Sequence, residues 1–134
     1  MAKTKTSASG AASILSVEPQ LFVADLAVAR QFYVEKLGFE VAFSYGEPPY
    51  YMQVFRGGAR LNLRRVEGPV FDAGFRSREP DALSATLALN AAEALFAEFQ
   101  SAGVTFHQDL RTEPWGARTF IVEDPDGNLI AFAA

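Results

Sequence analysis

The sequence contains no cysteine and a single histidine, and both scarcities limit the chemistry that the chain can perform. Without cysteine there is no disulfide bond, no thiolate nucleophile and no cysteine-ligated metal. One histidine, His107, allows at most one imidazole ligand per chain, so a metal site within one chain would depend on carboxylates. The Ser, His and Asp residues show no spacing typical of a catalytic triad. His107 and Asp109 are expected to share one strand face, which leaves an acid–base pair open.

Long apolar runs and basic clusters are lacking too. No apolar run approaches the roughly 20 residues of a membrane-spanning helix. The net charge is −4, without a basic stripe, which argues against a nucleic-acid partner. Residues 1–16 are small and polar and lack an apolar stretch of signal-peptide length, so we interpret them as a disordered lead-in of a soluble, cytoplasmic protein. A basic, serine-rich start is also compatible with a targeting sequence.

What the chain does contain is an internal repeat. A length of 134 residues with 49% hydrophobic residues suits a single core, so residues 17–134 are predicted to form one domain. Within it, a strand, an amphipathic helix and three further strands follow one another twice, and each helix ends at a glycine. Superposing Val23 on Leu89 and Gly38 on Gly103 aligns the two copies, with a period of about 65 residues.

The repeat predicts an α+β fold of two tandem βαβββ modules. The first module, about residues 17–66, has expected strands at 20–24, 39–44, 51–55 and 59–66 and a helix from Leu26 to Leu37. The second, about residues 82–134, has expected strands at 83–89, 104–108, 118–122 and 128–132 and a helix capped by Asn90. Residues 67–81 contain two glycines and two prolines and are predicted to be an irregular connector.

Each helix can cover only one face of its four-stranded sheet. Pairing two such sheets, within a chain or across a dimer, would form a half-barrel with a concave cleft. Because paired folds of this kind share sheet edges and helices between subunits, we predict a homodimer.

The stretch from Pro114 to Phe132 organises the second module. Asp124-Pro125-Asp126-Gly127-Asn128 has the composition of a tight turn between two strands. We interpret the carboxylates of Glu18, Glu113, Glu123 and Asp124 as turn and surface groups. Trp115 is expected on a loop, where its indole could be a structural plug or a wall of a binding cleft.

These segments together resemble the vicinal oxygen chelate superfamily, which includes glyoxalase I, extradiol dioxygenases, fosfomycin-resistance thiol transferases and bleomycin-resistance proteins. The resemblance is carried by Leu21-Phe22-Val23-Ala24-Asp25 leading to Phe32-Tyr33 and Leu37-Gly38-Phe39, by Ala102-Gly103-Val104, and by the turn Asp124–Asn128. Pro114-Trp115-Gly116 with Arg118 resembles the bleomycin-resistance branch.

The resemblance implies four metal-ligand positions on strands that face the cleft. Carried over residue by residue, these positions fall on Glu18, Asn62, Ser84 and Ala131. One carboxylate, one amide, one hydroxyl and one methyl cannot hold a catalytic divalent ion, which needs about three protein ligands. His107 does not fall on a ligand position. We therefore predict that the metal chemistry of the superfamily is absent and that the chain needs no cofactor.

Strand alternation then predicts which side chains face the cleft. Gln20, Thr86 and Leu129 share the parity of the ligand positions, as do several of the candidate ligand-binding residues. Those candidates are Phe22, Tyr51, Phe55, Arg60, Asn62, Arg64, Phe106, Trp115 and Arg118. Two open alternatives are that the aromatic residues belong to the core or a dimer interface, and that Arg60 and Arg64 lie on a solvated edge or pair with Glu67 or Glu47. Arg118 could position the tryptophan loop rather than touch a ligand.

Three functional hypotheses follow. The first is a metal-independent protein that binds an aromatic or anionic small molecule in clefts at a dimer interface. The second is a lyase, isomerase or dioxygenase whose metal is held by Glu18 and non-standard partners such as His107. The third is a partner-binding or purely structural dimer. Whether the chain is an enzyme stays open, and the missing ligands favour binding.

Overall fold

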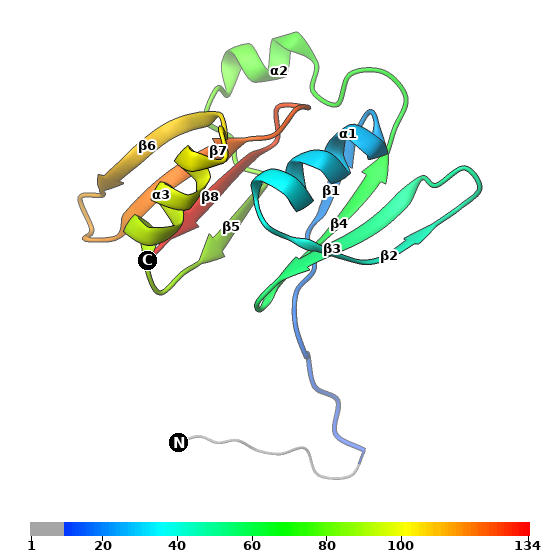
Figure 1. Cartoon of the computed structure of the whole chain (residues 1–134), viewed down its shortest axis with the longest axis horizontal. Coiled ribbons are helices and arrows are strands. Elements are labelled where there is room, and N and C mark those ends of the chain that lie inside the picture. Colours follow the sequence, from blue (N-terminus) through cyan, green and yellow to red (C-terminus); the bar gives the residue numbers. More distant parts are fainter. Residues whose placement is uncertain (1–9) are drawn as a thin grey trace.

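The computed structural model describes residues 10–134, which fold into two copies of one unit (Figure 1). The first unit contains β1 (Gln20–Val23), α1 (Leu26–Arg30), the π-helical turn η1 (Gln31–Lys36), β2 (Glu40–Tyr45), β3 (Tyr51–Arg56) and β4 (Ala59–Arg65). The second contains β5 (Ala85–Ala88), α3 (Ala92–Ser101), β6 (Phe106–Thr112), β7 (Arg118–Glu123) and β8 (Leu129–Ala133), and α2 (Ala73–Arg78) lies between the units. We predicted that residues 1–16 are disordered. Residues 1–9 lie outside the described residues, and residues 10–19 contain no helix or strand.

Each unit forms its own mixed sheet, and the two sheets have the same topology. The strand orders are β1-β4-β3-β2 and β5-β8-β7-β6. In both, the first strand runs parallel to the last and the other neighbours are antiparallel. The α+β architecture of two βαβββ modules predicted from the sequence is therefore confirmed.

One hydrophobic core joins the two modules. α1 packs on β4, and α3 packs on β6 and β7, so each helix covers one face of its own sheet. The core takes its largest contributions from both of these covered faces, including Leu21, Val23, Leu61 and Leu63 from the first sheet and Phe99, Phe120, Val122 and Phe132 from the second module. The covered faces of both sheets therefore contribute to one core.

The turn after β7 is a buried structural element. The Asp124 side chain is 4% exposed, so its interpretation as a surface group was wrong. Its carboxylate accepts hydrogen bonds from the Tyr33 hydroxyl at 2.8 Å and from the Asn128 side chain at 2.9 Å. Tyr33 belongs to the first module and is itself fully buried, so this contact fastens one module to the other.

The same turn covers the outer edge of β1. The Asn128 amide donates to the Phe22 carbonyl oxygen at 2.9 Å, and the Ala24 N–H donates to Asp126 at 3.0 Å. Both backbone groups lie at the edge that no strand pairs, because β1 pairs only with β4. Side chains of the second module thus replace the missing strand.

Three local features differ from the sequence-based expectations. The connector contains the helix α2, because the Asp72 side chain accepts the Phe75 N–H at 2.8 Å and Arg76 lies over the Phe71 ring at 4.3 Å. α3 begins after Ala91 and has no side-chain cap, so Asn90 is not the N-cap. β6 continues to Thr112, beyond the predicted end at residue 108, because it pairs with β7 along its length.

The glycines that end the two helices adopt the predicted left-handed conformation, with φ of +74° at Gly38 and +77° at Gly103. Replacing Gly103 with alanine is expected to lower the free energy of unfolding by about 1–2 kcal/mol, from backbone strain alone, since a Cβ there meets nothing within 4 Å. At Gly38 a Cβ would lie 2.8 Å from the Arg56 guanidinium, which pairs with Glu98. Gly38→Ala should therefore cost up to about 1 kcal/mol more than Gly103→Ala. Urea unfolding of both variants tests this, and equal losses would contradict it.

No helix among residues 10–134 is long and apolar enough to cross a membrane.

Candidate functional site

The uncovered face of the first sheet, called here the open face, gathers six of the predicted site residues. Strand alternation buries Leu21, Met52, Val54, Leu61 and Leu63 against the helix and turns their neighbours outward. Register then aligns the outward residues across the strands, and the open face comprises Gln20, Phe22, Glu40, Phe43, Tyr45, Tyr51, Gln53, Phe55, Arg60, Asn62 and Arg64.

The open face exposes an unusual share of aromatic surface. Phe22 is 45% exposed, Phe43 47% and Tyr45 65%. The rings of Phe43 and Tyr51 stack with centroids 6.2 Å apart, and the Arg60 guanidinium lies 5.1 Å from the Phe55 ring centre. Flat apolar rings beside a cation are suited to an aromatic or anionic ligand.

Neither arginine of the open face pairs with the carboxylates considered from the sequence. Within residues 10–134, Glu67 pairs with Arg65 at 3.4 Å. Arg60 donates instead to the side-chain oxygen of Gln53 at 2.9 Å. Arg64 is exposed and lies beside Phe22 and Tyr51 in the strand register.

A chain of polar side chains crosses the middle of the open face. Gln53 is 8% exposed and donates to Glu18 at 3.1 Å and to Asn62 at 2.9 Å. The Asn62 amide also donates to Glu18, at 3.4 Å. Glu18 and Asn62, two of the four predicted ligand-equivalent positions, therefore meet here. The Glu18 carboxylate is hydrogen-bonded to the side-chain amides of Gln53 and Asn62. Sequence reasoning missed Gln53, although its alternation with buried Met52 and Val54 was a usable signal.

The other two ligand-equivalent positions lie in the second module. Ser84 donates its hydroxyl to Asn128 at 2.8 Å, and Ala131 is 7% exposed on β8. Residues 10–134 hold no group of three or more His, Asp or Glu side chains that could bind a metal ion.

His107 lies on β6 as expected but has a different partner. Its Nε2 lies 2.7 Å from an Asp81 carboxylate oxygen of the connector. The register of β6 shifts on both sides of Gln108, so simple alternation does not govern this part of the strand. The sequence left open an acid–base pair of His107 with Asp109, but the carboxylate that contacts His107 is that of Asp81.

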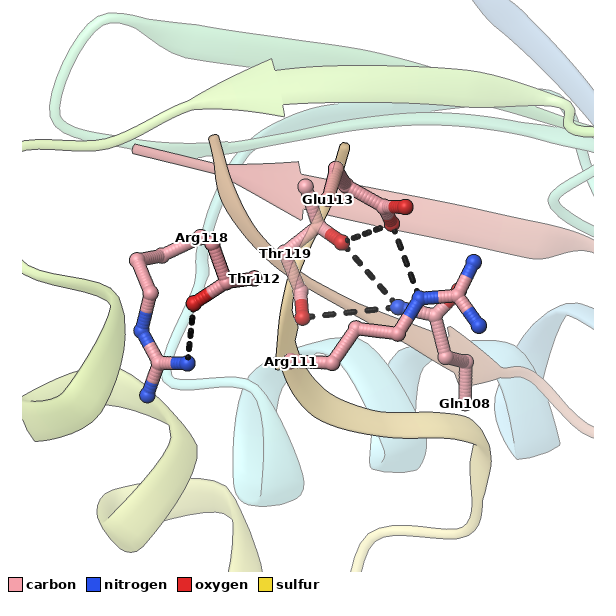
Figure 2. Close-up of polar contacts among 6 residues, drawn as sticks. All are labelled: Gln108, Arg111, Thr112, Glu113, Arg118 and Thr119. Carbon is pink, nitrogen blue, oxygen red and sulfur yellow. Dashed lines mark hydrogen bonds and ion pairs between the residues drawn. The ribbon is translucent and has the colours of Figure 1, made fainter. Parts of the chain in front are cut away.

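The second module has a polar cluster of its own (Figure 2). Glu113 is 8% exposed, so its interpretation as a surface group was wrong. Its carboxylate accepts hydrogen bonds from the Thr119 hydroxyl and from Arg111 Nε at 3.1 Å. The Gln108 amide donates to Thr119 Oγ1 at 3.0 Å. No motif marks this cluster, because its members come together only through the β6–β7 pairing.

The Thr119 hydroxyl, and then Arg111, hold the pKa of Glu113 below its ordinary value of 4.5. Replacing Thr119 with valine is therefore expected to raise that pKa, measurable by NMR titration of the Glu113 carboxyl carbon. A depressed folded pKa stabilises the fold above pH 4.5 and loses that contribution as pH falls through the folded pKa. The stability difference between wild type and Thr119→Val should accordingly shrink in acid. Thr112→Val, which alters the Arg118 contact instead, is the control and should leave Glu113 unchanged.

Trp115 lies at the tip of the same hairpin. The loop is closed by hydrogen bonds from Glu113 N to Ala117 O at 2.7 Å and from Gly116 N to Glu113 O at 2.9 Å. The indole is 76% exposed and stacks on no other ring of residues 10–134. Of the two interpretations of Trp115, a buried plug is excluded.

The remaining two candidate residues face α3 rather than the open face. Phe106 packs against Phe96, with ring centroids 4.6 Å apart, and against Phe120. Arg118 donates to Glu93 of α3 and to Thr112, both at 3.0 Å (Figure 2 shows the second contact). Both side chains thus serve the packing of the second module.

Comparisons with known proteins extend over nearly the whole chain. The model of the Glyoxalase/Bleomycin resistance protein/Dioxygenase superfamily matches residues 13–132. The bleomycin-binding protein from bleomycin-producing Streptomyces verticillus, solved with copper(II)-bleomycin, is 26% identical, with 91% of this chain and 97% of that chain covered and a TM-score of 0.70.

Two further solved structures are similar to the same extent. UcmS2 is 25% identical, with 91% of this chain and 98% of that chain covered and a TM-score of 0.70. TioX from Micromonospora sp. ML1 is 22% identical, with 89% and 97% covered and a TM-score of 0.70, and supports the fold alone. No curated protein sequence matches the chain.

Proposed function

Because the chain belongs to the glyoxalase/bleomycin resistance protein/dioxygenase superfamily, we propose that it is a metal-independent small-molecule binding protein that holds an aromatic, anionic ligand on the open face. The observation that carries the proposal is the alignment of exposed Phe22, Phe43 and Tyr45 beside Arg60 and Arg64 on one sheet face. Rings supply flat apolar contact, and guanidinium groups supply charge-assisted hydrogen bonds to a carboxylate or sulfonate.

The proposed site consists of the six predicted residues of the open face, Phe22, Tyr51, Phe55, Arg60, Asn62 and Arg64, together with Trp115. Trp115 belongs to the other module, on the loop between β6 and β7. We therefore place the ligand between the open face of one copy and the second sheet of another, in a homodimer. The copper(II)-bleomycin complex of the Streptomyces verticillus relative supports this use of the fold.

The absence of a metal requirement rests on the donor set. The Glu18 carboxylate accepts hydrogen bonds from the amides of Gln53 and Asn62, and His107 is hydrogen-bonded to Asp81. The two groups that a metal-dependent lyase, isomerase or dioxygenase would share thus sit in separate clusters of separate modules. Elemental analysis of protein purified without chelators tests this alternative, because one tightly bound metal per chain would favour the enzyme.

Ligand binding can be followed through Trp115, the chain's single tryptophan. We expect 2-naphthoate or 1-naphthalenesulfonate, both aromatic anions, to change its emission saturably, with the same affinity before and after EDTA treatment. Phe22→Ala is expected to weaken binding at least tenfold with little change in melting temperature. Val28→Ala is the matched control, since Val28 on α1 is also 45% exposed. The proposal fails if neither probe binds, or if the two variants bind alike.

A further inference from the structure

A small polar pocket lies on the face of the second sheet that α3 does not cover. Its volume is about 320 Å³, and it is lined by Asp81, Leu83, His107, Gln108, Arg111 and Ile121. Ile121 places the pocket on this face, because its neighbours on β7, Phe120 and Val122, are buried in the core. None of the lining residues belongs to the site of the proposed function, so the pocket is a separate feature.

Two β-bulges in β6 bring three of these side chains together. In a regular strand the Gln108 side chain would point away from those of His107 and Arg111. Between Phe106 and Gln108, and again between Gln108 and Arg111, β6 contains one residue more than the facing part of β7. Each bulge breaks the alternation, and all three side chains line one pocket as a result.

The internal repeat shows which of the two bulges is specific to the second module. The first bulge has a counterpart in β2, where the register shifts between Val41 and Phe43, one repeat period earlier. The second has none, because β2 pairs with β3 in regular register from Phe43 to Tyr45. The bulge that turns Arg111 toward the pocket is therefore an addition to the repeated architecture. Bulges that re-aim a side chain are frequent beside functional sites.

The buried Glu113 carboxylate determines how Gln108 faces the pocket. Thr119, and then Arg111, hold the pKa of Glu113 below its ordinary value of 4.5, so at neutral pH this carboxylate accepts hydrogen bonds only. The Thr119 hydroxyl donates its one proton to Glu113 and therefore accepts from the Gln108 amide nitrogen at 3.0 Å. Because Gln108 uses its nitrogen here, its Oε1 stays available as an acceptor, with no hydrogen bond among the described residues.

Arg111 and His107 are oriented in the same way, each by a carboxylate. Arg111 donates through Nε to Glu113 at 3.1 Å, and its two terminal nitrogens make no hydrogen bond within residues 10–134 (Figure 2). Because a carboxylate only accepts, His107 donates through Nε2 to Asp81 at 2.7 Å, which leaves Nδ1 of the neutral ring as an acceptor. The pocket thus offers two acceptors, Gln108 Oε1 and His107 Nδ1, together with the donors of Arg111.

We propose that this pocket binds the terminal primary carboxamide or urea group of a small molecule. Arg111 donates to the carbonyl oxygen of that group, while Gln108 and His107 accept its two N–H groups. A carboxylate fits less well, because it has no N–H to donate and because two carboxylates, Asp81 in the wall and Glu113 against Arg111, offset the one guanidinium. The pocket is complete within one chain, so the inference rests on neither the ligand nor the dimer of the proposed function.

His107 is the chain's single histidine, so its ring protons report on this pocket in proton NMR spectra. Titration with benzamide is expected to shift them saturably. Benzoate, which has nearly the same shape, should bind at least tenfold more weakly at constant pH and ionic strength. N,N-dimethylbenzamide, which lacks both N–H groups, should be weaker to a similar extent. Benzoate that binds as tightly as benzamide would overturn the proposal, as would benzamide that leaves the His107 signals unchanged.

Two variants test the roles of individual side chains. Arg111→Met removes the donor to the carbonyl oxygen and should weaken benzamide binding at least tenfold, whereas Arg118→Met, on the same hairpin but outside the pocket, should not. Thr119→Val frees the Gln108 amide to rotate, so the preference for benzamide over benzoate should fall. Thr112→Val is its matched control and should keep the preference. Equal binding by Arg111→Met and wild type would overturn the proposal, and an unchanged preference in Thr119→Val would overturn the acceptor role of Gln108.

These results are separable from the test of the proposed function. Benzamide binding is followed at His107, and binding of the aromatic anions is followed at Trp115. Saturable binding of the anions without a response of His107 to benzamide would overturn the carboxamide pocket alone. The reverse result would overturn the proposed function and leave the pocket intact.

Discussion

Replacing Asp124 with alanine is expected to lower the free energy of unfolding by about 3–5 kcal/mol, because several buried donors lose their acceptor at about 1 kcal/mol or more each. The carboxylate accepts from Tyr33, from the Asn128 side chain, and from the backbone N–H groups of Asp126 and Asn128. At 4% exposure, water cannot replace it. Chemical denaturation followed by circular dichroism measures the loss.

Two further variants show whether the loss comes from this network. Tyr33→Phe removes one donor and should cost about 1 kcal/mol. The double variant Asp124→Ala with Tyr33→Phe should lose less stability than the sum of the two single losses, because both substitutions remove the same hydrogen bond. A loss below about 1 kcal/mol for Asp124→Ala would show that the turn does not fasten the modules together.

The same carboxylate should leave a mark on the pH dependence of stability. Burial raises the pKa of Asp124 above its ordinary value of 3.8, although hydrogen bonds from Asn128 and Tyr33 oppose the shift. The folded state therefore binds the proton more tightly than the unfolded state. The stability that this proton uptake contributes is fully present below pH 3.8 and is lost as the pH rises through the pKa of Asp124 in the folded state. Compared with Asp124→Asn, the wild type should gain relative stability as pH falls toward 3.8.

Replacing Phe120 with alanine is the second change with a large expected effect, about 3–5 kcal/mol lost from the free energy of unfolding. Phe120 is fully buried. Its ring lies 5.4 Å from Phe96, 5.9 Å from Phe99 and 5.1 Å from Phe132, measured between centroids. A ring enclosed by other rings leaves a cavity that rigid neighbours fill poorly.

Phe22→Ala provides the contrast, since it removes the same side chain from the open face. Phe22 is 45% exposed, and its loss should cost less than about 1 kcal/mol. Thermal and urea unfolding of both variants under one set of conditions would separate the two classes of phenylalanine. Similar losses would mean that the open face is part of the core and not a surface available to a ligand.

The repeat made the fold predictable from the sequence. The helices end at Gly38 and Gly103 with positive φ, and the strands follow the expected order, because glycine position and apolar period are local signals. The helix α2 was not predicted because its stability comes from the Asp72 cap and from Arg76, which donates to the Gly127 carbonyl of a distant turn. Contacts of that kind do not appear as a hydrophobic period in the sequence.

The part of the candidate site that could be predicted from the sequence is the part that strand alternation places. Phe22, Tyr51, Phe55, Arg60, Asn62 and Arg64 share a face because a regular sheet dictates it. Phe106 was a candidate because of its aromatic ring and not because of alternation. It pairs with buried Val122, so its ring packs into the aromatic cluster under α3. The burial of Asp124 and Glu113 depends on partners far away or across a hairpin, and an acidic residue in a turn gives no sign of it.

The covering of the β1 edge has a consequence for how the chain is made. The Phe22–Asn128 and Ala24–Asp126 hydrogen bonds join residues 106 and 102 positions apart. At roughly 5–20 residues per second, a ribosome needs about 5–20 seconds to reach the turn after it has completed β1. During that interval the backbone groups of a nascent first module stay unpaired at one edge. That edge is where a chaperone or a neighbouring nascent chain would pair first, and the arrival of the last turn ends the exposure.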